Sequence, residues 1–208
     1  MYMKATSLVA VAALVVFASA STIHATDRQP AATECGDLGD TAPVNDGFPN
    51  RLSSLVGTDI RTGGHECFER VVLELGGSGE LPGFQVQYEP DPILDSPRGE
   101  PVEVAGEATL VLSVGAWMPD IEGNGYQGPL EFVPTNVVNI EELQQIENFE
   151  GQNAWAIGLD MQRDFTVSTL TEPFRIVIDI ALDPGGTPSP APTPTTAPAT
   201  GTTLPPTR

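Results

Sequence analysis

The chain has 208 residues, which is enough for one domain of ordinary size with extensions at its ends. Its formal net charge is −19, and removal of Lys4, the only lysine, would leave eight arginines against 28 acidic residues, a net charge of −20. A surface of this sign repels nucleic acid and anionic lipid at long range, which argues against nucleic acid as a partner.

The first twenty residues have the pattern of a secretory signal. A short start with one lysine precedes an apolar run over Leu8–Phe17, and Ala18–Ala20 supplies the small residues that a signal peptidase reads. We predict cleavage after Ala20, with cleavage after Ala25 as the alternative. The apolar run is shorter than the ~20 residues that a helix needs to cross a bilayer, so no transmembrane segment is expected after cleavage. The sequence therefore predicts a secreted protein, extracellular or associated with the cell wall.

Two further segments lack the periodicity of folded structure. Residues 21–51 are rich in Ala, Thr, Asp, Gly and Pro, and residues 184–208 consist almost entirely of Pro, Thr, Ala, Gly and Ser. Such compositions cannot bury a core. We therefore expect a flexible leader, one folded domain over residues 52–183 and a disordered C-terminal tail.

The chain has two cysteines, Cys35 in the leader and Cys67 in the domain. In an exported protein they are expected to form a disulfide, which would stabilise the fold by roughly 3–4 kcal/mol in the chain-entropy model. The alternative is a redox pair, or a nucleophilic Cys67 served by His65. The disulfide is our prediction because an oxidising compartment ties up the thiol.

Between these boundaries, short strand patterns alternate with glycine and proline. Residues 55–61 and 67–75 flank Gly63 and Gly64 and predict a β-hairpin that turns at these glycines. Apolar residues recur every three positions over residues 140–149, which predicts either a short helical turn or an irregular strand. Eight or nine strands with at most one short helix predict an all-β fold, a β-sandwich or a half-open barrel. Further strands are expected at 84–88, 101–104, 108–117, 137–140, 154–159, 165–170 and 174–182, with a proline-marked loop at 89–99.

Charged residues interrupt the apolar pattern of the second and the last of these strands. Glu69 and Arg70 lie on one strand, and Arg175 and Asp179 lie on the other. Opposite charges on adjacent strands stabilise a single register. We therefore expect either Arg70 to pair with Asp179 or Glu69 to pair with Arg175.

Five segments of the chain together carry a family pattern: Arg61–His65, Phe68–Leu73, Gly83–Pro90, Phe149–Gly151 and Pro173–Asp179. They resemble the AMIN-like domain of exported actinobacterial proteins and lipoproteins. The related AMIN domains are β-sandwich modules that attach amidases to peptidoglycan, so the resemblance implies a noncatalytic β domain of the cell envelope. The signature residues for which we expect a structural role are Arg61, Gly63, His65, Phe68, Glu69, Arg70, Arg175 and Asp179.

No residue pattern indicates catalysis. His24, the histidine other than His65, lies outside the predicted domain, and the domain contains no Gly-x-Ser-x-Gly elbow. With 28 acidic residues, a carboxylate pair carries no information about glycoside hydrolysis. We predict that the protein is not an enzyme and has no cofactor, and that His65 forms hydrogen bonds at the turn.

Residues 120–131 follow part of the calcium-loop pattern. Asp120, Glu122, Asn124 and Glu131 occupy its first, third, fifth and twelfth positions, a spacing that lets oxygen atoms converge on one hard cation. A glutamate at the third position, a proline inside the loop and the lack of flanking helices depart from the pattern. The two readings are a calcium site and an ordinary acidic loop.

Trp117 and Tyr126 flank the same loop. Exposed aromatic rings can stack on sugar rings, so the pair is a candidate glycan-binding platform. Packing in the core or in the loop is the alternative.

The whole sequence predicts a secreted, noncatalytic binding module of the cell envelope that binds peptidoglycan or another wall glycan. The alternative partner is another exported protein, bound through a sheet edge or the loop at residues 118–130. A calcium-dependent surface protein is the third alternative.

Overall fold

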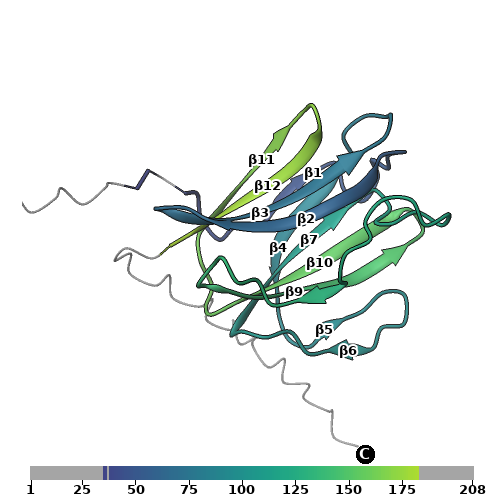
Figure 1. The fold of residues 1–208 in the computed structure, drawn as a ribbon. Coiled ribbons are helices and arrows are strands. Elements are labelled where there is room, and N and C mark those ends of the chain that lie inside the picture. The colour runs from purple at the N-terminus through teal and green to yellow at the C-terminus, as the bar shows by residue number, and fades with distance from the viewer. Residues whose placement is uncertain (1–34, 37, 183–208) are drawn as a thin grey trace, which may run out of the picture. The chain divides into compact units, whose positions relative to one another are not determined.

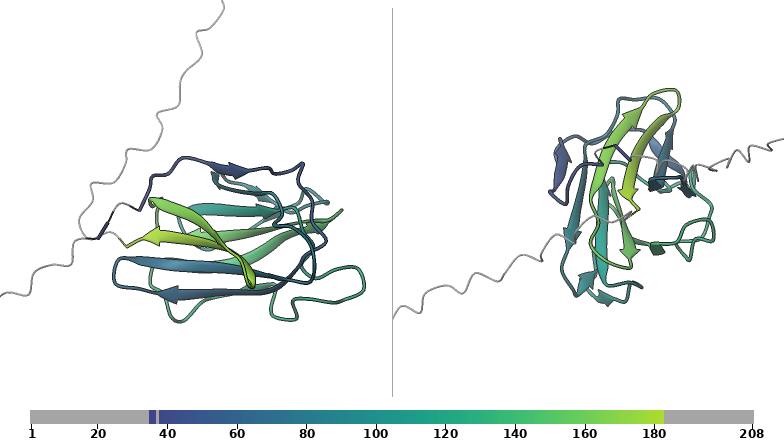
Figure 2. Two further views of the ribbon diagram at one scale, coloured as in Figure 1. Left: turned by 90° about the horizontal axis from the view of Figure 1, so that it is seen from above. Right: turned by 90° about the vertical axis from the view of Figure 1, so that its left-hand side faces the viewer.

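The computed structural model describes residues 35–36 and 38–182. The expected signal peptide, the first part of the leader and the C-terminal tail lie outside these residues. The described part of the chain contains twelve strands and no helix, which confirms the all-β class (Figures 1 and 2). Three of the strands have only two residues each. One of them, Pro101–Val102, lies within the strand expected at residues 101–104, whereas Ile93–Leu94 and Glu131–Phe132 were not expected. Within the described residues, no helix could cross a membrane.

Two antiparallel sheets share a hydrophobic core and form a β-sandwich (Figure 1). The four-stranded sheet has the order β11 (Phe165–Leu170), β12 (Phe174–Ala181), β3 (Phe68–Gly76) and β2 (Val56–Gly64). The six-stranded sheet has the order β1 (Val44–Asp46), β4 (Phe84–Glu89), β7 (Ala108–Val114), β10 (Gln152–Leu159), β9 (Ile140–Phe149) and β8 (Glu131–Phe132). The remaining strands, β5 (Ile93–Leu94) and β6 (Pro101–Val102), pair with each other on the side of the six-stranded sheet away from the four-stranded sheet.

Alternate residues of the strands fill the space between the sheets. On β12, Ile176, Ile178 and Ile180 are at most 1% exposed, as the two-residue period of a strand predicts. Trp155 of β10 is fully buried, and burying a large apolar side chain contributes roughly 1.5–3 kcal/mol. The core therefore determines which face of each sheet is left outside.

The first hairpin forms, but its turn is not at the two glycines. Gly63 and Gly64 lie within β2 and pair with β3, and His65–Cys67 makes the connection. A Cβ on Gly64 would lie 2.9 Å from the carbonyl oxygen of Asn136, closer than real side chains allow. The glycine at this position therefore permits the close approach of a distant loop, and the expected glycine turn is wrong.

Strand β9 explains the three-residue spacing that favoured a helical turn. It is an irregular strand with two register shifts against β10, which leave Glu141 and Ile146 without a partner position. Such bulges turn a two-residue step into a three-residue step, so Ile140 and Leu143 both enter the core. The helical alternative is wrong. The strand expected at residues 137–140 is also wrong, because β9 begins only at Ile140.

The fold begins earlier than the expected boundary at residue 52. The backbone N–H of Phe165 donates to the carbonyl of Asp40 at 3.1 Å, and β1 pairs with β4. The guanidinium of Arg51 forms an ion pair with Asp46 at 2.8 Å. Backbone pairing at sheet edges holds these residues, and such pairing does not require hydrophobic periodicity. The later part of the expected leader therefore belongs to the domain.

Candidate functional site

The stretch considered for nucleophilic chemistry is a structural junction. Cys67 forms a disulfide with Cys35, which confirms that prediction, and neither cysteine is a free thiol. His65 is exposed, and its ring stacks on Phe68 with 4.5 Å between ring centroids. The backbone N–H of His65 donates to the Phe68 carbonyl at 2.9 Å. The disulfide thus joins the start of the domain to the first hairpin.

Arg70 and Asp179 lie directly opposite each other on β3 and β12. The Nε and Nη2 groups of Arg70 donate to the two carboxylate oxygens of Asp179 at 2.6 and 2.8 Å. This bidentate hydrogen bonding raises the pKa of Arg70. The same guanidinium lies 4.9 Å from the centre of the Phe68 ring. Of the two charge pairings expected from the sequence, this one forms.

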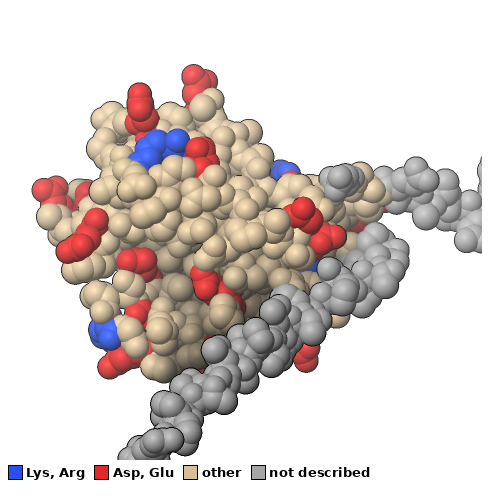
Figure 3. All heavy atoms as spheres, turned by 180° about the vertical axis from the view of Figure 1, so that it is seen from behind, with Lys and Arg blue, Asp and Glu red and all other residues tan. Residues whose placement is uncertain are grey.

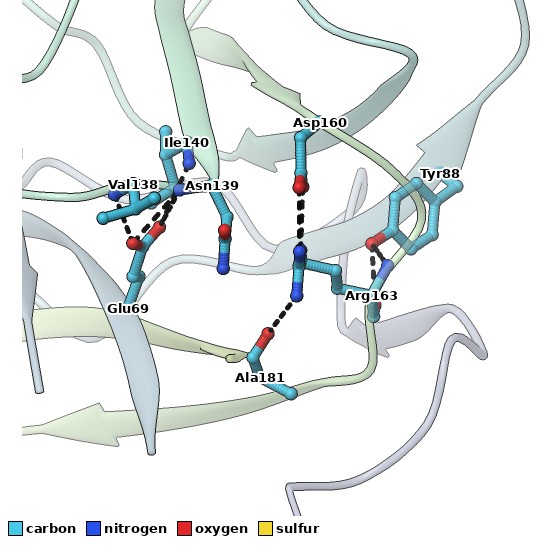
Figure 4. A network of polar contacts seen from close by, with 8 residues as sticks. All are labelled: Glu69, Tyr88, Val138, Asn139, Ile140, Asp160, Arg163 and Ala181. Atoms are coloured by element: carbon cyan, nitrogen blue, oxygen red, sulfur yellow. Dashed lines mark hydrogen bonds and ion pairs between the residues drawn. The ribbon is translucent and has the colours of Figure 1, made fainter. Parts of the chain in front are cut away.

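Glu69 does not pair with Arg175. It points into the core from β3, is 2% exposed, and accepts hydrogen bonds from the backbone N–H groups of Val138, Asn139 and Ile140 (Figure 4). A buried carboxylate persists only where donors satisfy it. We call this arrangement the Glu69 clamp. It fixes the loop before β9, and its donors are backbone groups, which no sequence pattern indicates.

A second polar cluster ties the end of β12 to the neighbouring sheet (Figure 4). The buried guanidinium of Arg163 donates to both carboxylate oxygens of Asp160 at 2.8 Å and to the Ala181 carbonyl at 3.2 Å. The Tyr88 hydroxyl donates to the backbone carbonyl of Arg163 at 2.7 Å, and burial raises the pKa of Tyr88 to about 12. This cluster also joins elements of the fold.

The remaining signature charges lie on the outer face of the four-stranded sheet. Arg61 donates to Asp59 at 2.6 Å and to Glu74 at 3.2 Å. Arg175 donates to the Pro173 carbonyl at 3.3 Å. These two arginines therefore contact groups of their own sheet or its turn, and a role in strand register stays a prediction.

The candidate calcium loop satisfies its own first position. The Asp120 carboxylate accepts hydrogen bonds from the side chain of Asn124 at 3.0 Å and from the backbone N–H groups of Asn124 and Glu122 at 2.8 and 2.9 Å. These bonds, that of the Asn124 side chain first, lower the pKa of Asp120. Glu131 lies in β8, opposite Gln144. Among the described residues, no group of three His, Cys, Asp or Glu side chains is placed to hold a metal ion. The loop has the geometry of an acidic turn, and calcium binding stays a prediction.

Trp117 and Tyr126 do not form a common exposed platform. Tyr126 is 7% exposed, its ring packs edge-on against Trp155, and its hydroxyl donates to the Pro129 carbonyl at 2.9 Å. Trp117 is half-buried, and its carbonyl accepts a hydrogen bond from the Gly57 N–H at 2.8 Å. Core packing removes the Tyr126 ring from any site where a sugar could stack.

A groove of about 470 Å³ lies on the outer face of the six-stranded sheet. Its other side is formed by residues 90–102, which include β5 and β6 and which we call the arm (Figure 1). The groove is lined by Val111 and Ser113 of β7, Ala154 of β10, Ile146 and Glu147 of β9, Glu89 of β4, and residues 90–94 and 96 of the arm.

The arm is attached to the sheet at Ser96, beside the groove, and the chain just beyond the arm packs on the sheet at Ala105. The backbone N–H of Ser96 donates to the Ile146 carbonyl at 2.8 Å, and its hydroxyl donates to Glu147 at 2.8 Å. Beyond the arm, Ala105 packs so closely on Gly158 that a Cβ at the glycine would overlap the Ala105 carbonyl oxygen. These attachments hold a recess open between arm and sheet.

The tip of the arm is stabilised by its own charges. The Asp95 carboxylate accepts a hydrogen bond from the Glu100 N–H at 2.9 Å and from Nε of Arg98 at 2.7 Å. The backbone hydrogen bond and the guanidinium lower the pKa of Asp95. A smaller recess of about 280 Å³ lies beside this tip.

Sequence reasoning missed this groove and the acidic residues that line it. One signal was available in the proline-marked loop, where Ile93 and Leu94 interrupt an otherwise polar stretch. Ile93 is 4% exposed, so this stretch folds against the sheet. The groove exists only because residues distant in sequence meet, which periodicity cannot show.

The described structure defines a class of domain, an antiparallel β-sandwich with a ligand-sized groove on one outer face. The chain belongs to the AMIN-like domain family, whose model matches residues 55–182, more than half of its length. The match confirms the resemblance seen in the five sequence segments, and family membership suggests a binding module of the cell envelope. Comparisons with curated proteins and with solved structures gave no match.

Proposed function

We propose that the protein is a secreted, noncatalytic module of the cell envelope that binds peptidoglycan in the groove between the arm and the six-stranded sheet. The groove carries the proposal, because it is a ligand-sized recess in a domain of this family. The signal pattern at the N-terminus supports export.

The size and lining of the groove suit a segment of a polymer. Its volume of about 470 Å³ falls in the range of roughly 300–1,000 Å³ that is usual for ligand sites. Ser113 and Ala154 have small side chains, so a ligand can approach the sheet closely. Ile93 and Ile146 offer apolar contacts, and the carboxylates of the lining offer hydrogen-bond acceptors.

Co-sedimentation with purified, insoluble peptidoglycan tests this proposal. The wild-type protein is expected to sediment with the polymer at low and at high salt. The variant Ser113→Trp places a large ring in the groove and is expected to lose most of this binding.

The matched control is Ser168→Trp. Ser168 is exposed on β11, in the other sheet, so the same substitution leaves the groove unchanged. Equal melting temperatures would show that both variants are folded. Failure of the wild-type protein to sediment at any salt would reject wall binding. Equal sedimentation of both variants would reject the groove as the site.

Exposed apolar side chains favour a second candidate function, an interaction with another exported protein. Ile121 is 83% exposed, Val133 is 69% exposed and Val138 is 84% exposed. Apolar side chains that are this exposed can contribute contacts to a protein partner. This candidate predicts no sedimentation with protein-free peptidoglycan, and loss of a co-purifying exported protein in Ile121→Asp.

A further inference from the structure

The groove is lined by carboxylates without a positive partner. Glu89, Asp91 and Glu147 belong to its lining, and none of the described lining residues is Arg, Lys or His. Glu89 accepts a hydrogen bond from the neutral side chain of Gln87, and Glu147 accepts one from the neutral Ser96 hydroxyl at 2.8 Å. Glu89 and Glu147 are therefore hydrogen-bonded to neutral groups, and none of the three carboxylates forms an ion pair within the described residues.

All ion pairs between side chains in the described residues lie outside the groove lining. Ion pairs join Arg70 to Asp179, and further pairs involve Arg51, Arg61, Arg98 and Arg163, all with acidic residues that do not line the groove. The groove is thus a place where a bound cation, and not a side chain of the domain, can provide the compensating charge.

The residues that line the groove restrict the kind of cation that it can bind. No group of three acidic, histidine or cysteine side chains in the described residues is placed to hold a metal ion, so the groove does not offer the set of ligands that a metal ion needs. The lining contains no aromatic ring to stack on a sugar or a planar cation. It does contain Ile93, Ile146 and Val111, which suit an aliphatic stem.

We propose that the groove recognises a primary amine on an aliphatic side chain, carried by the peptides of the wall polymer. The methylene stem would pack on Ile93 and Ile146, and the ammonium group would donate charge-assisted hydrogen bonds to Glu89 and Glu147. This inference rests on the proposed function and names the part of peptidoglycan that the groove contacts.

Chemical blocking of the amines tests the inference. Binding of the full exported chain is measured on peptidoglycan whose peptides carry a free side-chain amine, before and after N-acetylation of that polymer. Acetylation removes the charge and leaves the glycan intact. We expect the apparent Kd to rise about tenfold or more, because hydrogen bonds between charged groups are involved.

Two double variants complete the experiment. Glu89→Gln/Glu147→Gln is expected to bind untreated polymer as weakly as wild type binds the acetylated polymer, and to be insensitive to acetylation. Glu107→Gln/Glu141→Gln removes two exposed carboxylates that do not line the groove and should behave as wild type.

Each other outcome is informative. Equal binding to both polymers would overturn amine recognition and leave wall binding intact. Binding to neither polymer would overturn the proposed function, and the inference with it. A titration with the soluble peptide Ala-Lys-Ala and its Nε-acetyl form then shows whether the groove binds an amine that the wall polymer does not carry. Amine-dependent binding of the peptide without binding of the polymer would assign the groove to a protein partner and contradict the wall-borne ligand.

Discussion

The outer faces of the two sheets use charge in opposite ways. On the four-stranded sheet, Arg70 faces Asp179 at 2.6 Å, and the pair occupies opposite positions of adjacent strands. On the six-stranded sheet, Glu89 and Glu147 line the groove and meet only neutral donors among the described residues. Compensated charge on the first face fixes register. Uncompensated charge on the second face disfavours the isolated domain slightly and favours a cationic ligand.

The largest loss of stability is expected on replacing Glu69, whose buried carboxylate lies on the inner face of the four-stranded sheet and accepts hydrogen bonds from the loop before β9. Glu69→Ala removes the acceptor from the N–H groups of Val138, Asn139 and Ile140. Unsatisfied buried groups cost about 1–3 kcal/mol each, so the free energy of unfolding should fall by about 3 kcal/mol or more. Urea denaturation measures this change. A loss below about 1 kcal/mol would contradict the structural role of the Glu69 clamp.

The matched control is Glu141→Ala, in β9, the strand that follows the loop held by the Glu69 clamp. Glu141 is exposed at a bulge of β9, so its removal should change stability by no more than about 0.5 kcal/mol.

Arg70→Met should give the next largest effect. It leaves the Asp179 carboxylate, whose side chain is 15% exposed, without its bidentate partner. We expect a loss of about 2–3 kcal/mol, and a smaller loss in Arg70→Met/Asp179→Leu, where no charge is left alone. Thermal and urea unfolding of Arg70→Met, of Asp179→Leu and of the double variant form a double-mutant cycle. Unchanged melting of Arg70→Met would reject this account of the outer face.

Asp160 provides a pH-dependent test of compensated charge. Its hydrogen bonds with Arg163 lower the pKa of Asp160, so the folded state holds the carboxylate in its charged form more strongly than the unfolded chain does. The resulting stability is present above the unfolded pKa of about 3.9 and is lost as the pH falls through the lower folded value.

Asp160→Asn should therefore cost about 1–2 kcal/mol near pH 7. The difference in melting temperature between this variant and wild type should stay constant above about pH 5 and shrink below about pH 4. A difference that does not depend on pH would contradict the assignment.

The smallest effect on stability is expected in the groove. Glu89→Gln/Glu147→Gln removes charges that form no ion pair within the described residues, so unfolding free energy should change by no more than about 0.5 kcal/mol. Calorimetry measures this change. A large destabilisation would show that these acids are structural, like those of the four-stranded sheet.

Much of the sandwich could be predicted from local pattern. The strand at residues 165–170 has the expected bounds, and alternation along β12 places Ile176 and Ile178 in the core as expected. The disulfide was also expected, and the pairing of Arg70 with Asp179 was one of two expected alternatives, because complementary residue types can be recognised in the sequence whatever their separation.

The features missed in the sequence depend on contacts between distant segments. Gly64 was predicted to be a turn residue. The structure instead requires glycine there because a side chain would collide with the backbone of Asn136, which is distant in the sequence. The bulges of β9 appear only when it is paired with β10. The groove needs the arm folded over β7 and β10, and its acidic lining is inconspicuous among 28 acidic residues. The acidic side chains spread over the face seen in Figure 3 illustrate why composition alone could not single it out.

The most direct test of the central claim is a map of amide chemical shifts during titration with soluble peptidoglycan fragments that carry free side-chain amines. The groove predicts shifts at Val111, Ile146 and Ala154, with the outer face around Arg70 unchanged. Shifts confined to the outer face of the four-stranded sheet, or no shifts at saturating fragment, would contradict it.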